Sequence, residues 1–133
     1  MPTGEWPMHW PPLLRRLHAA RGSDARTAMP RLADLLPFDG LEGIDAAVEL
    51  LRHAIACDAH VVVVGDFDCD GATACAVGVR GLRMLGAKHV SHAVPNRIVH
   101  GYGLTAGLVD ELAALQPDLL VTVDHGIACH AGI

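Results

Sequence analysis

The chain has 133 residues, of which 51% are hydrophobic and 19% are charged. This composition is enough for one globular domain with a hydrophobic core, and it excludes a disordered or collagen-like chain. No hydrophobic run approaches the roughly 18 residues that span a membrane, and the first residues lack the pattern of a secretory signal. The sequence therefore predicts a cytoplasmic protein that has no membrane partner.

The formal net charge is −5, from 10 basic and 15 acidic residues. Nucleic-acid-binding domains usually carry an excess of basic residues, so the charge alone argues against that class. Four of the negative charges belong to Asp66, Asp68, Asp70 and Asp124, and the remaining sequence is close to neutral. The four cysteines form no Cys-x-x-Cys pair, which predicts small buried thiols rather than a zinc site or disulfide bonds.

Helical signals dominate the first 58 residues. A first helix is expected at residues 13–21, between two prolines and a glycine. A short helix is expected at residues 30–36, before the next proline. Apolar residues then recur at helical spacing over residues 44–55. We therefore expect residues 1–58 to form a helical N-terminal lead-in.

Strand and helix signals alternate in the second part of the chain, residues 59–133. Val61–Val64 is a continuous β-branched run, which is typical of a strand buried on both faces. The order of strand, helix, strand, helix, strand predicts a parallel, doubly wound, Rossmann-like α/β sheet. The predicted strands lie at 61–64, 89–94 and 119–123, and the predicted helices lie at 72–85 and from Thr105, its N-cap, to about 115.

Only a few residues follow the third predicted strand, and they are too few for a helix that covers the sheet. Parallel sheets need cover on both faces. We therefore expect the chain to be the N-terminal part of a longer protein, so that residues 59–133 form an incomplete α/β domain.

Acidic residues follow two of the predicted strands, at the point where each strand ends. The first strand continues into the acidic segment 65–71, with sequence GDFDCDG, and the third continues into Asp124-His125-Gly126. Ligands of doubly wound sheets bind beyond the carboxyl ends of the strands. If the two strands are neighbours, their carboxylates converge, and a divalent cation such as Mg²⁺ or Mn²⁺ relieves the resulting repulsion.

Alternating aspartates also occur in other motifs. An EF-hand loop that starts at Asp66 needs an acidic ligand at its twelfth position, where Val77 stands, so we reject it. A haloacid-dehalogenase-type phosphatase would use Asp68 as its nucleophile and Asp70 as its acid, although Ala72 occupies a position where that family expects Thr or Val. A glycine- and aspartate-rich turn without metal is the third interpretation.

Three segments in chain order resemble the DHH phosphoesterases, in particular their branch of single-strand-specific DNA exonucleases. The segments are GDFDCDGATA, VPNRIVHGYGL and LLVTVDHGI. The resemblance implies a DHH-type α/β fold with a two-metal Mn²⁺ or Mg²⁺ site that hydrolyses phosphodiester bonds. It implies 5′→3′ digestion of single-stranded DNA in recombination and repair. Helicases and single-strand-binding protein are the implied protein partners.

The resemblance also implies roles for individual residues. Asp68 and Asp70 are the implied metal ligands from the first motif, and Asp124 is the implied carboxylate that bridges to or joins the second metal. Asp66 is implied as a further ligand or as a partner of the ligands, and Asp68, Asp70 and Asp124 are thereby catalytic. Arg97 lies in a glycine-containing loop after the second strand, where a guanidinium can clamp a phosphate oxygen.

His125 and Gly126 are the other implied substrate-binding residues, and His125 stands where this branch usually has Asn. The Asp-His-His motif that gives the family its name is expected beyond residue 133. Two alternatives stay open: an enzyme of the DHH or haloacid-dehalogenase type that acts on a small phosphoester, and an inactive fragment that is not an enzyme.

Overall fold

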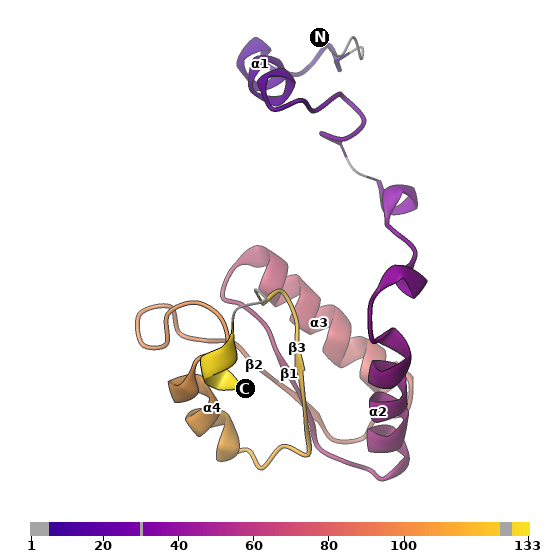
Figure 1. Ribbon diagram of the computed structural model, residues 1–133, viewed down its shortest axis with the longest axis vertical. Coiled ribbons are helices and arrows are strands. Elements are labelled where there is room, and N and C mark those ends of the chain that lie inside the picture. The colour runs from indigo at the N-terminus through magenta and orange to yellow at the C-terminus, as the bar shows by residue number, and fades with distance from the viewer. Residues whose placement is uncertain (1–5, 30, 126–128) are drawn as a thin grey trace. The chain divides into compact units, whose positions relative to one another are not determined.

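The computed structural model describes residues 6–29, 31–125 and 129–133, and the chain forms two compact units, residues 1–42 and 43–133 (Figure 1). The predicted boundary between domains, after residue 58, stays a prediction; the helix before it belongs to the second unit. Among the described helices, none has the length and hydrophobicity that crossing a membrane requires.

The first unit contains one α-helix and two short 3₁₀ helices. Helix α1 spans Pro12–Ala20, in agreement with the prediction, and Gly22 follows its end in the left-handed conformation with φ of +75°. The helix predicted for residues 30–36 is only a 3₁₀ turn, η1, at Leu32–Asp34, and η2 follows at Phe38–Gly40. A single turn results because Pro37 disfavours helical backbone at the residue before it.

The second unit is an α/β sheet whose three strands are all parallel, in the order β2–β1–β3. This confirms the predicted fold class. Its elements are α2 (Ile44–Ala56), β1 (Val61–Val64), α3 (Cys69–Met84), β2 (Val90–Ala93), α4 (Ala106–Ala113), β3 (Leu119–Thr122) and the 3₁₀ helix η3 (His130–Gly132).

The central strand β1 forms the middle of the core, and all four of its valines are completely buried. Side chains alternate across a strand, so Val61 and Val63 pack in a cluster with residues of α2 and α3, whereas Val62 and Val64 pack with residues of α4. Figure 1 shows α3 and α4 on opposite faces of the sheet. Each buried valine contributes about 1.5–3 kcal/mol through the hydrophobic effect.

Helix α3 begins at Cys69, three residues earlier than the sequence predicted. The reason is an N-cap: Asp68 Oδ1 accepts hydrogen bonds from the backbone N–H groups of Asp70, at 3.1 Å, and Gly71, at 3.0 Å. Helix α4 begins as predicted, and Thr105 Oγ1 accepts from the backbone N–H of Leu108 at 3.4 Å.

The cysteines are only partly as predicted. Cys75 is buried under β1, but Cys57 and Cys69 are exposed, which corrects the expectation of buried thiols. Cys57 lies at the exposed end of α2, and Cys69 lies in the first turn of α3, so neither is covered by the sheet.

Hydrogen bonds around His60 join the amino ends of the three strands. The backbone N–H of His60 donates to Asp118 Oδ2 at 2.7 Å. Its ring nitrogen Nδ1 lies 3.1 Å from the carbonyl oxygen of Leu115, and Nε2 lies 2.6 Å from Ser91 Oγ. Because a carbonyl only accepts, Nδ1 carries the proton and the Ser91 hydroxyl donates to Nε2.

Candidate metal centre

The two acidic segments lie at the same edge of the sheet. Val64 of β1 is in register with Thr122 of β3, and the backbone N–H of Val123 donates to the carbonyl of Val64 at 2.9 Å. Asp66 lies two residues after Val64, and Asp124 lies two residues after its partner Thr122, so both aspartates leave the sheet at the same level. Because α3 and α4 cross opposite faces, the order of strands along the chain reverses between β1 and β3, which is where doubly wound sheets bind their ligands.

Asp66 is a buried carboxylate with an unsatisfied oxygen. Its side chain is only 1% exposed, and within the described ranges Oδ1 has no hydrogen-bond partner. A buried anionic oxygen without a donor is unfavourable, and its usual compensation is a cation or a hydrogen bond. Among the described residues, the buried Asp66 oxygen has neither form of compensation.

Asp68 and Asp70 stand at the start of α3. The cap bonds from Asp68 Oδ1 orient this carboxylate at the helix N-terminus, while Asp70 lies in the first turn. Both are exposed, and the positive end of the helix dipole favours negative charge at both positions. The residues that start the helix are thus the same residues for which the sequence predicts metal binding.

Asp124 interacts with the three carboxylates of the first segment. Desolvation raises the pKa of this exposed carboxyl, and the negative charges of Asp68 and Asp70, a carboxyl–carboxyl hydrogen bond with Asp68 and the charge of Asp66 raise the pKa further. Its backbone has a φ of +59°, in the left-handed region. Such strained backbone is uncommon for a residue other than glycine and clusters at functional sites.

Hard oxygen donors of this kind fit a divalent cation such as Mg²⁺ or Mn²⁺. Both the unsatisfied oxygen of Asp66 and the repulsion at Asp124 are features that such a cation relieves. Across residues 6–29, 31–125 and 129–133, no three His, Cys, Asp or Glu side chains are grouped so that they could hold an ion. The charges of Asp66, Asp68 and Asp70 thus act on Asp124, but the four side chains do not form a complete metal-binding group among the described residues.

The two remaining residues of the third motif differ in what the structure describes. Both ring nitrogens of His125 are buried, and neither has a hydrogen-bond partner in the described part of the chain. Gly126 lies outside the described residues. The predicted substrate-binding roles of both residues stay predictions.

Two glycines allow the end of β1 and the start of α3 to touch. A Cβ atom at Gly71 would overlap the backbone of Asp66, and a Cβ atom at Gly65 would overlap the Cys75 side chain and the Gly71 carbonyl. The buried position of Asp66 against α3 therefore depends on glycine at position 71.

Arg97 lies next to the first acidic segment. Its guanidinium carbon stands 4.9 Å from the centre of the Phe67 ring, a cation–π contact. The Tyr102 ring meets the same Phe67 ring edge to face, with ring centres 6.4 Å apart. The loop 95–104 is thereby anchored to the segment that contains Asp66 and Asp68.

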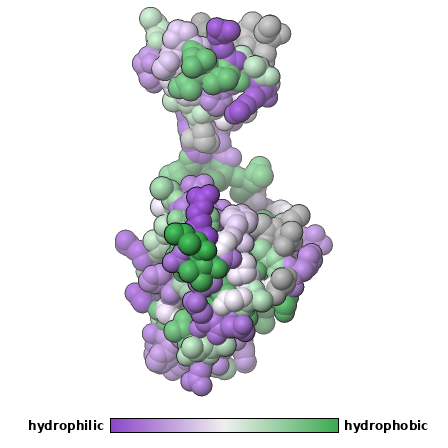
Figure 2. Space-filling model, turned by 90° about the vertical axis from the view of Figure 1, so that its left-hand side faces the viewer, coloured by the Kyte–Doolittle hydropathy of each residue, from purple (hydrophilic) through white to green (hydrophobic). Residues whose placement is uncertain are grey.

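The loop also exposes apolar side chains, since Ile98 and Val99 are both largely accessible to solvent. Hydrophobic and strongly hydrophilic side chains lie next to one another on the face drawn in Figure 2. The contact between Phe67 and Arg97 was not predicted from the sequence. The position of Phe67 between Asp66 and Asp68 could have indicated it, because a residue there lies close to any group that approaches the two carboxylates.

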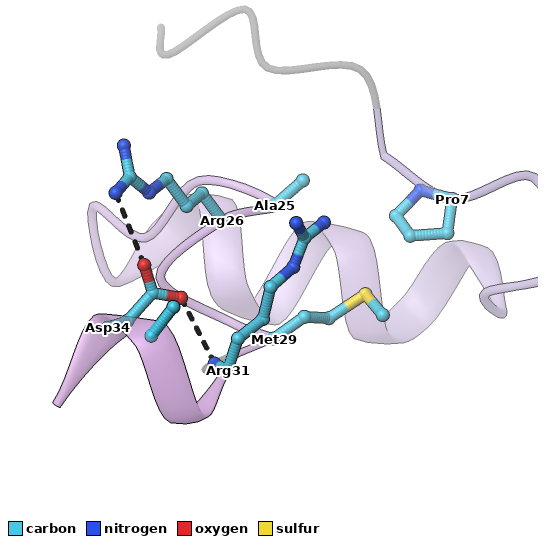
Figure 3. A pocket seen from close by; sticks show the side chains of 7 residues that line it. Pro7, Ala25, Arg26, Met29, Arg31 and Asp34 are labelled. Atoms are coloured by element: carbon cyan, nitrogen blue, oxygen red, sulfur yellow. Dashed lines mark hydrogen bonds and ion pairs between the residues drawn. The ribbon is translucent and has the colours of Figure 1, made fainter.

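A separate cavity of about 580 Å³ lies within the first unit (Figure 3). Asp34 at its wall accepts from the Arg26 guanidinium at 3.2 Å and from the backbone N–H of Arg31 at 3.0 Å. These bonds lower the pKa of the Asp34 carboxyl, with the Arg31 backbone bond as the largest cause. None of the predicted site residues lines this cavity, and the ion pair at its wall joins Arg26 and Asp34 of the same unit.

Carboxylates at the reversal point of a parallel α/β sheet form a type of site that suits a divalent cation, and comparison with known proteins gives the family of this chain. The family model described as "DHH family, N-terminal domain" matches residues 60–133. The chain belongs to the DHH family. This membership favours a DHH-type site over the haloacid-dehalogenase alternative.

Several relatives share most of this chain. It is 48% identical over 132 residues to the single-stranded-DNA-specific exonuclease RecJ of Salmonella typhimurium, covering 98% of this chain and 23% of that protein. It is 44% identical over 132 residues to the Escherichia coli protein of the same name, again covering 98% and 23%. The chain thus spans about a quarter of the length of these curated relatives.

Two solved structures are similar. A crystal structure of exonuclease RecJ bound to manganese matches with a TM-score of 0.63 and 42% identity, covering 72% of this chain and 24% of that one. A crystal structure of RecJ from Thermus thermophilus in complex with Mn²⁺ matches with a TM-score of 0.57 and 36% identity, covering 86% and 15%.

Proposed function

We propose that the protein is a metal-dependent exonuclease that hydrolyses phosphodiester bonds of single-stranded DNA from the 5′ end, in recombination and repair. The observation that carries the proposal is the convergence of Asp66, Asp68, Asp70 and Asp124 where β1 and β3 end. Its support from relatives is the 48% identity to a single-stranded-DNA-specific exonuclease.

In this proposal Asp66, Asp68, Asp70 and Asp124 hold Mn²⁺ or Mg²⁺, with further ligands supplied from outside the described residues. A two-metal site of this type supplies an activated hydroxide and neutralises charge on the phosphate oxygens. The chain's own contribution is orientation. The α3 cap fixes Asp68, the contact with Gly71 fixes the Asp66 backbone, and the left-handed backbone of Asp124 directs the third strand's carboxylate to the same edge.

Arg97 is the proposed phosphate contact. The cation–π contact holds its guanidinium beside Phe67, which lies between two of the acidic residues. A guanidinium offers several N–H donors in one plane, so it can bind phosphate oxygens while contacting an aromatic face. Residues 95–104 contain no other arginine or lysine, so Arg97 is the group of this loop that attracts the negative backbone of DNA to a negatively charged edge.

The test uses the product of the complete gene with Mn²⁺, and compares a single-stranded oligonucleotide with the same strand in a duplex. We expect Asp68→Asn and Asp124→Asn to lower the rate at least about 100-fold, because each removes a proposed metal ligand. Asp110→Asn, on the exposed side of α4, is the matched control and should leave the rate unchanged. Labels at the 5′ and 3′ ends report the direction of digestion.

Hydrolysis of p-nitrophenyl phosphate without cleavage of the oligonucleotide would instead support the small-phosphoester alternative. Equal rates for Asp68→Asn and wild type would contradict the carboxylate site itself. Helicases and single-strand-binding protein as partners, and a cytoplasmic location, belong to the same proposal, and co-purification from cell extract tests the partners.

A further inference from the structure

The loop 95–104 is attached to helix α4 through the imidazole of His100. The backbone N–H of Asn96 donates to His100 Nδ1 at 3.0 Å, and His100 Nε2 lies 2.9 Å from Glu111 Oε1 on α4. The His100 side chain is only 8% exposed, whereas that of Glu111 is 64% exposed. The His100 ring therefore bridges Asn96, at the start of the loop, and Glu111 of α4.

These two contacts define the protonation of the ring. An N–H donor at Asn96 requires that Nδ1 accept, so the neutral ring carries its proton on Nε2 and donates it to the Glu111 carboxylate. Both ring nitrogens are thus used, each in a different role. A side chain that supplies only one of the roles satisfies only one of the partners.

Arg97 lies inside the turn that this imidazole closes. The backbone carbonyl of Asn96 accepts from the N–H groups of Val99, at 3.1 Å, and His100, at 2.8 Å. The Asn96 side chain accepts from the N–H of Ile98 at 2.9 Å. Arg97 is therefore enclosed between Asn96 and His100, which are bound to each other through both backbone and side chain.

We infer that His100 is a positioning residue for substrate binding: its bridge between Asn96 and Glu111 fixes the turn that presents Arg97 beside the acidic edge. The inference rests on the proposed function, because it takes Arg97 as the phosphate contact. A preorganised turn lowers the entropy lost when an arginine binds its ligand. Phe67 supplies a second point of attachment, through its contact with the Arg97 side chain.

The ring can be replaced one contact at a time. His100→Asn places an acceptor near Nδ1 and loses the reach to Glu111, whereas His100→Gln keeps a donor near Nε2 and loses the acceptor for Asn96. His100→Ala removes both contacts. Glu111→Gln keeps an acceptor for Nε2–H and serves as the conservative variant, and His89→Ala, at another histidine, is the control on an exposed position.

Two measurements on each variant test the inference. Hydrogen exchange of the Asn96 amide reports the bridge directly, and we expect faster exchange in His100→Ala and His100→Gln than in His100→Asn. Fluorescence anisotropy with a labelled single-stranded oligothymidylate reports binding. We expect His100→Ala to weaken binding about two- to tenfold, because the loss of both bridge contacts weakens the Arg97–phosphate contact by about the strength of one hydrogen bond. Glu111→Gln and His89→Ala should bind like wild type.

The decisive variant combines His100→Ala with Arg97→Ala. If His100 acts through Arg97, the double variant binds no more weakly than Arg97→Ala alone. An additive loss, or unchanged binding by His100→Ala while Arg97→Ala is impaired, overturns the positioning role and leaves the proposed function intact. Absence of binding by the wild type overturns the proposed function, and the positioning role with it. Unchanged Asn96 exchange in His100→Ala overturns the bridge, and with it the positioning role, but leaves the proposed function intact.

Discussion

The two edges of the sheet differ in whether their acidic residues have partners among the described residues. At the amino edge, Asp118 accepts the backbone N–H of His60, and Asp58 pairs with Lys88 at 2.7 Å. At the carboxyl edge, Asp66 keeps a buried oxygen without a described partner, and Asp124 is surrounded by like charges. The amino edge therefore stabilises the fold by itself, while the carboxyl edge holds charges that no described residue compensates.

This difference separates residues that maintain the fold from residues that are available for chemistry. Substitutions at paired charges should destabilise the protein, and removal of an unpaired charge should stabilise it when no cation is present. The sign of the change in stability therefore identifies the edge at which a carboxylate acts.

The largest expected effect comes from Gly71→Ala at the carboxyl edge. The new methyl group would overlap the backbone of Asp66, which cannot move aside, so we expect a loss of about 3 kcal/mol in the free energy of unfolding. The measurement is urea denaturation followed by circular dichroism.

The matched control is Gly81→Ala in the same helix, where a Cβ atom meets nothing within 4 Å. It should stabilise α3 by about 0.5–1 kcal/mol, because alanine has the higher helix propensity. Equal effects of the two substitutions would show that the junction of β1 and α3 is not tightly packed.

The second effect tests the amino edge. Asp118→Ala removes the acceptor of the His60 N–H, so we expect the free energy of unfolding to fall by about 1.5 kcal/mol, as for a hydrogen bond to a charged group. Asp118→Asn keeps an oxygen acceptor and should lose less. Denaturation of the two variants side by side gives the result, and a harmless Asp118→Ala would refute the structural role of this edge.

The third effect is smaller and has the opposite sign. Without divalent cations, Asp124→Asn should raise the melting temperature at pH 7, because it removes a carboxylate that like charges disfavour. The folded pKa of Asp124 is raised, so the destabilisation is complete above that pKa and absent below the unfolded value of about 3.9. The difference between variant and wild type should therefore shrink as the pH falls from 7 towards 4.

Thermal melts in EDTA, at several pH values, provide this measurement. Addition of Mn²⁺ should then stabilise the wild type more than Asp124→Asn, which reverses their order if binding to the folded state is strong enough. A variant that is less stable than wild type in EDTA would mean that Asp124 has a stabilising partner.

The smallest effect is expected at Lys88. Its ion pair with Asp58 is short, but both side chains are exposed, and such pairs contribute little in water. Lys88→Gln should change the free energy of unfolding by less than about 0.5 kcal/mol. Denaturation is measured at low salt and at about 0.5 M NaCl. At the higher salt concentration, screening should remove even this difference between the variant and wild type.

Much of the fold could be predicted from local patterns. The four valines of β1 and the spacing of apolar residues in α2 depend on periodicity, which the sequence displays directly. The start of α3 could not be placed by periodicity, because its first turn is formed by the capping carboxylate of Asp68 and the glycine at 71. A preference for aspartate at N-caps is visible in sequence, but the same residue also fits a turn.

The site was predictable as two acidic strand ends, yet their proximity was not. It depends on β3 lying beside β1 rather than beside β2, which the connections across opposite faces decide. The link between His100 and Glu111 was missed for a similar reason. It joins an irregular loop to a helix, where no repeat spacing relates the two residues.

The strand order also determines when the acidic edge exists during folding. β1 and β2 pair across a connection that contains only α3. β3 pairs with β1 across a longer connection, which also includes β2 and α4, so this contact has a larger sequence separation. We therefore expect Asp124 to join Asp66 and Asp68 late, and an intermediate with only the first two strands would lack the carboxylate of the third. The time at which Mn²⁺ begins to bind during refolding would consequently report when the third strand docks.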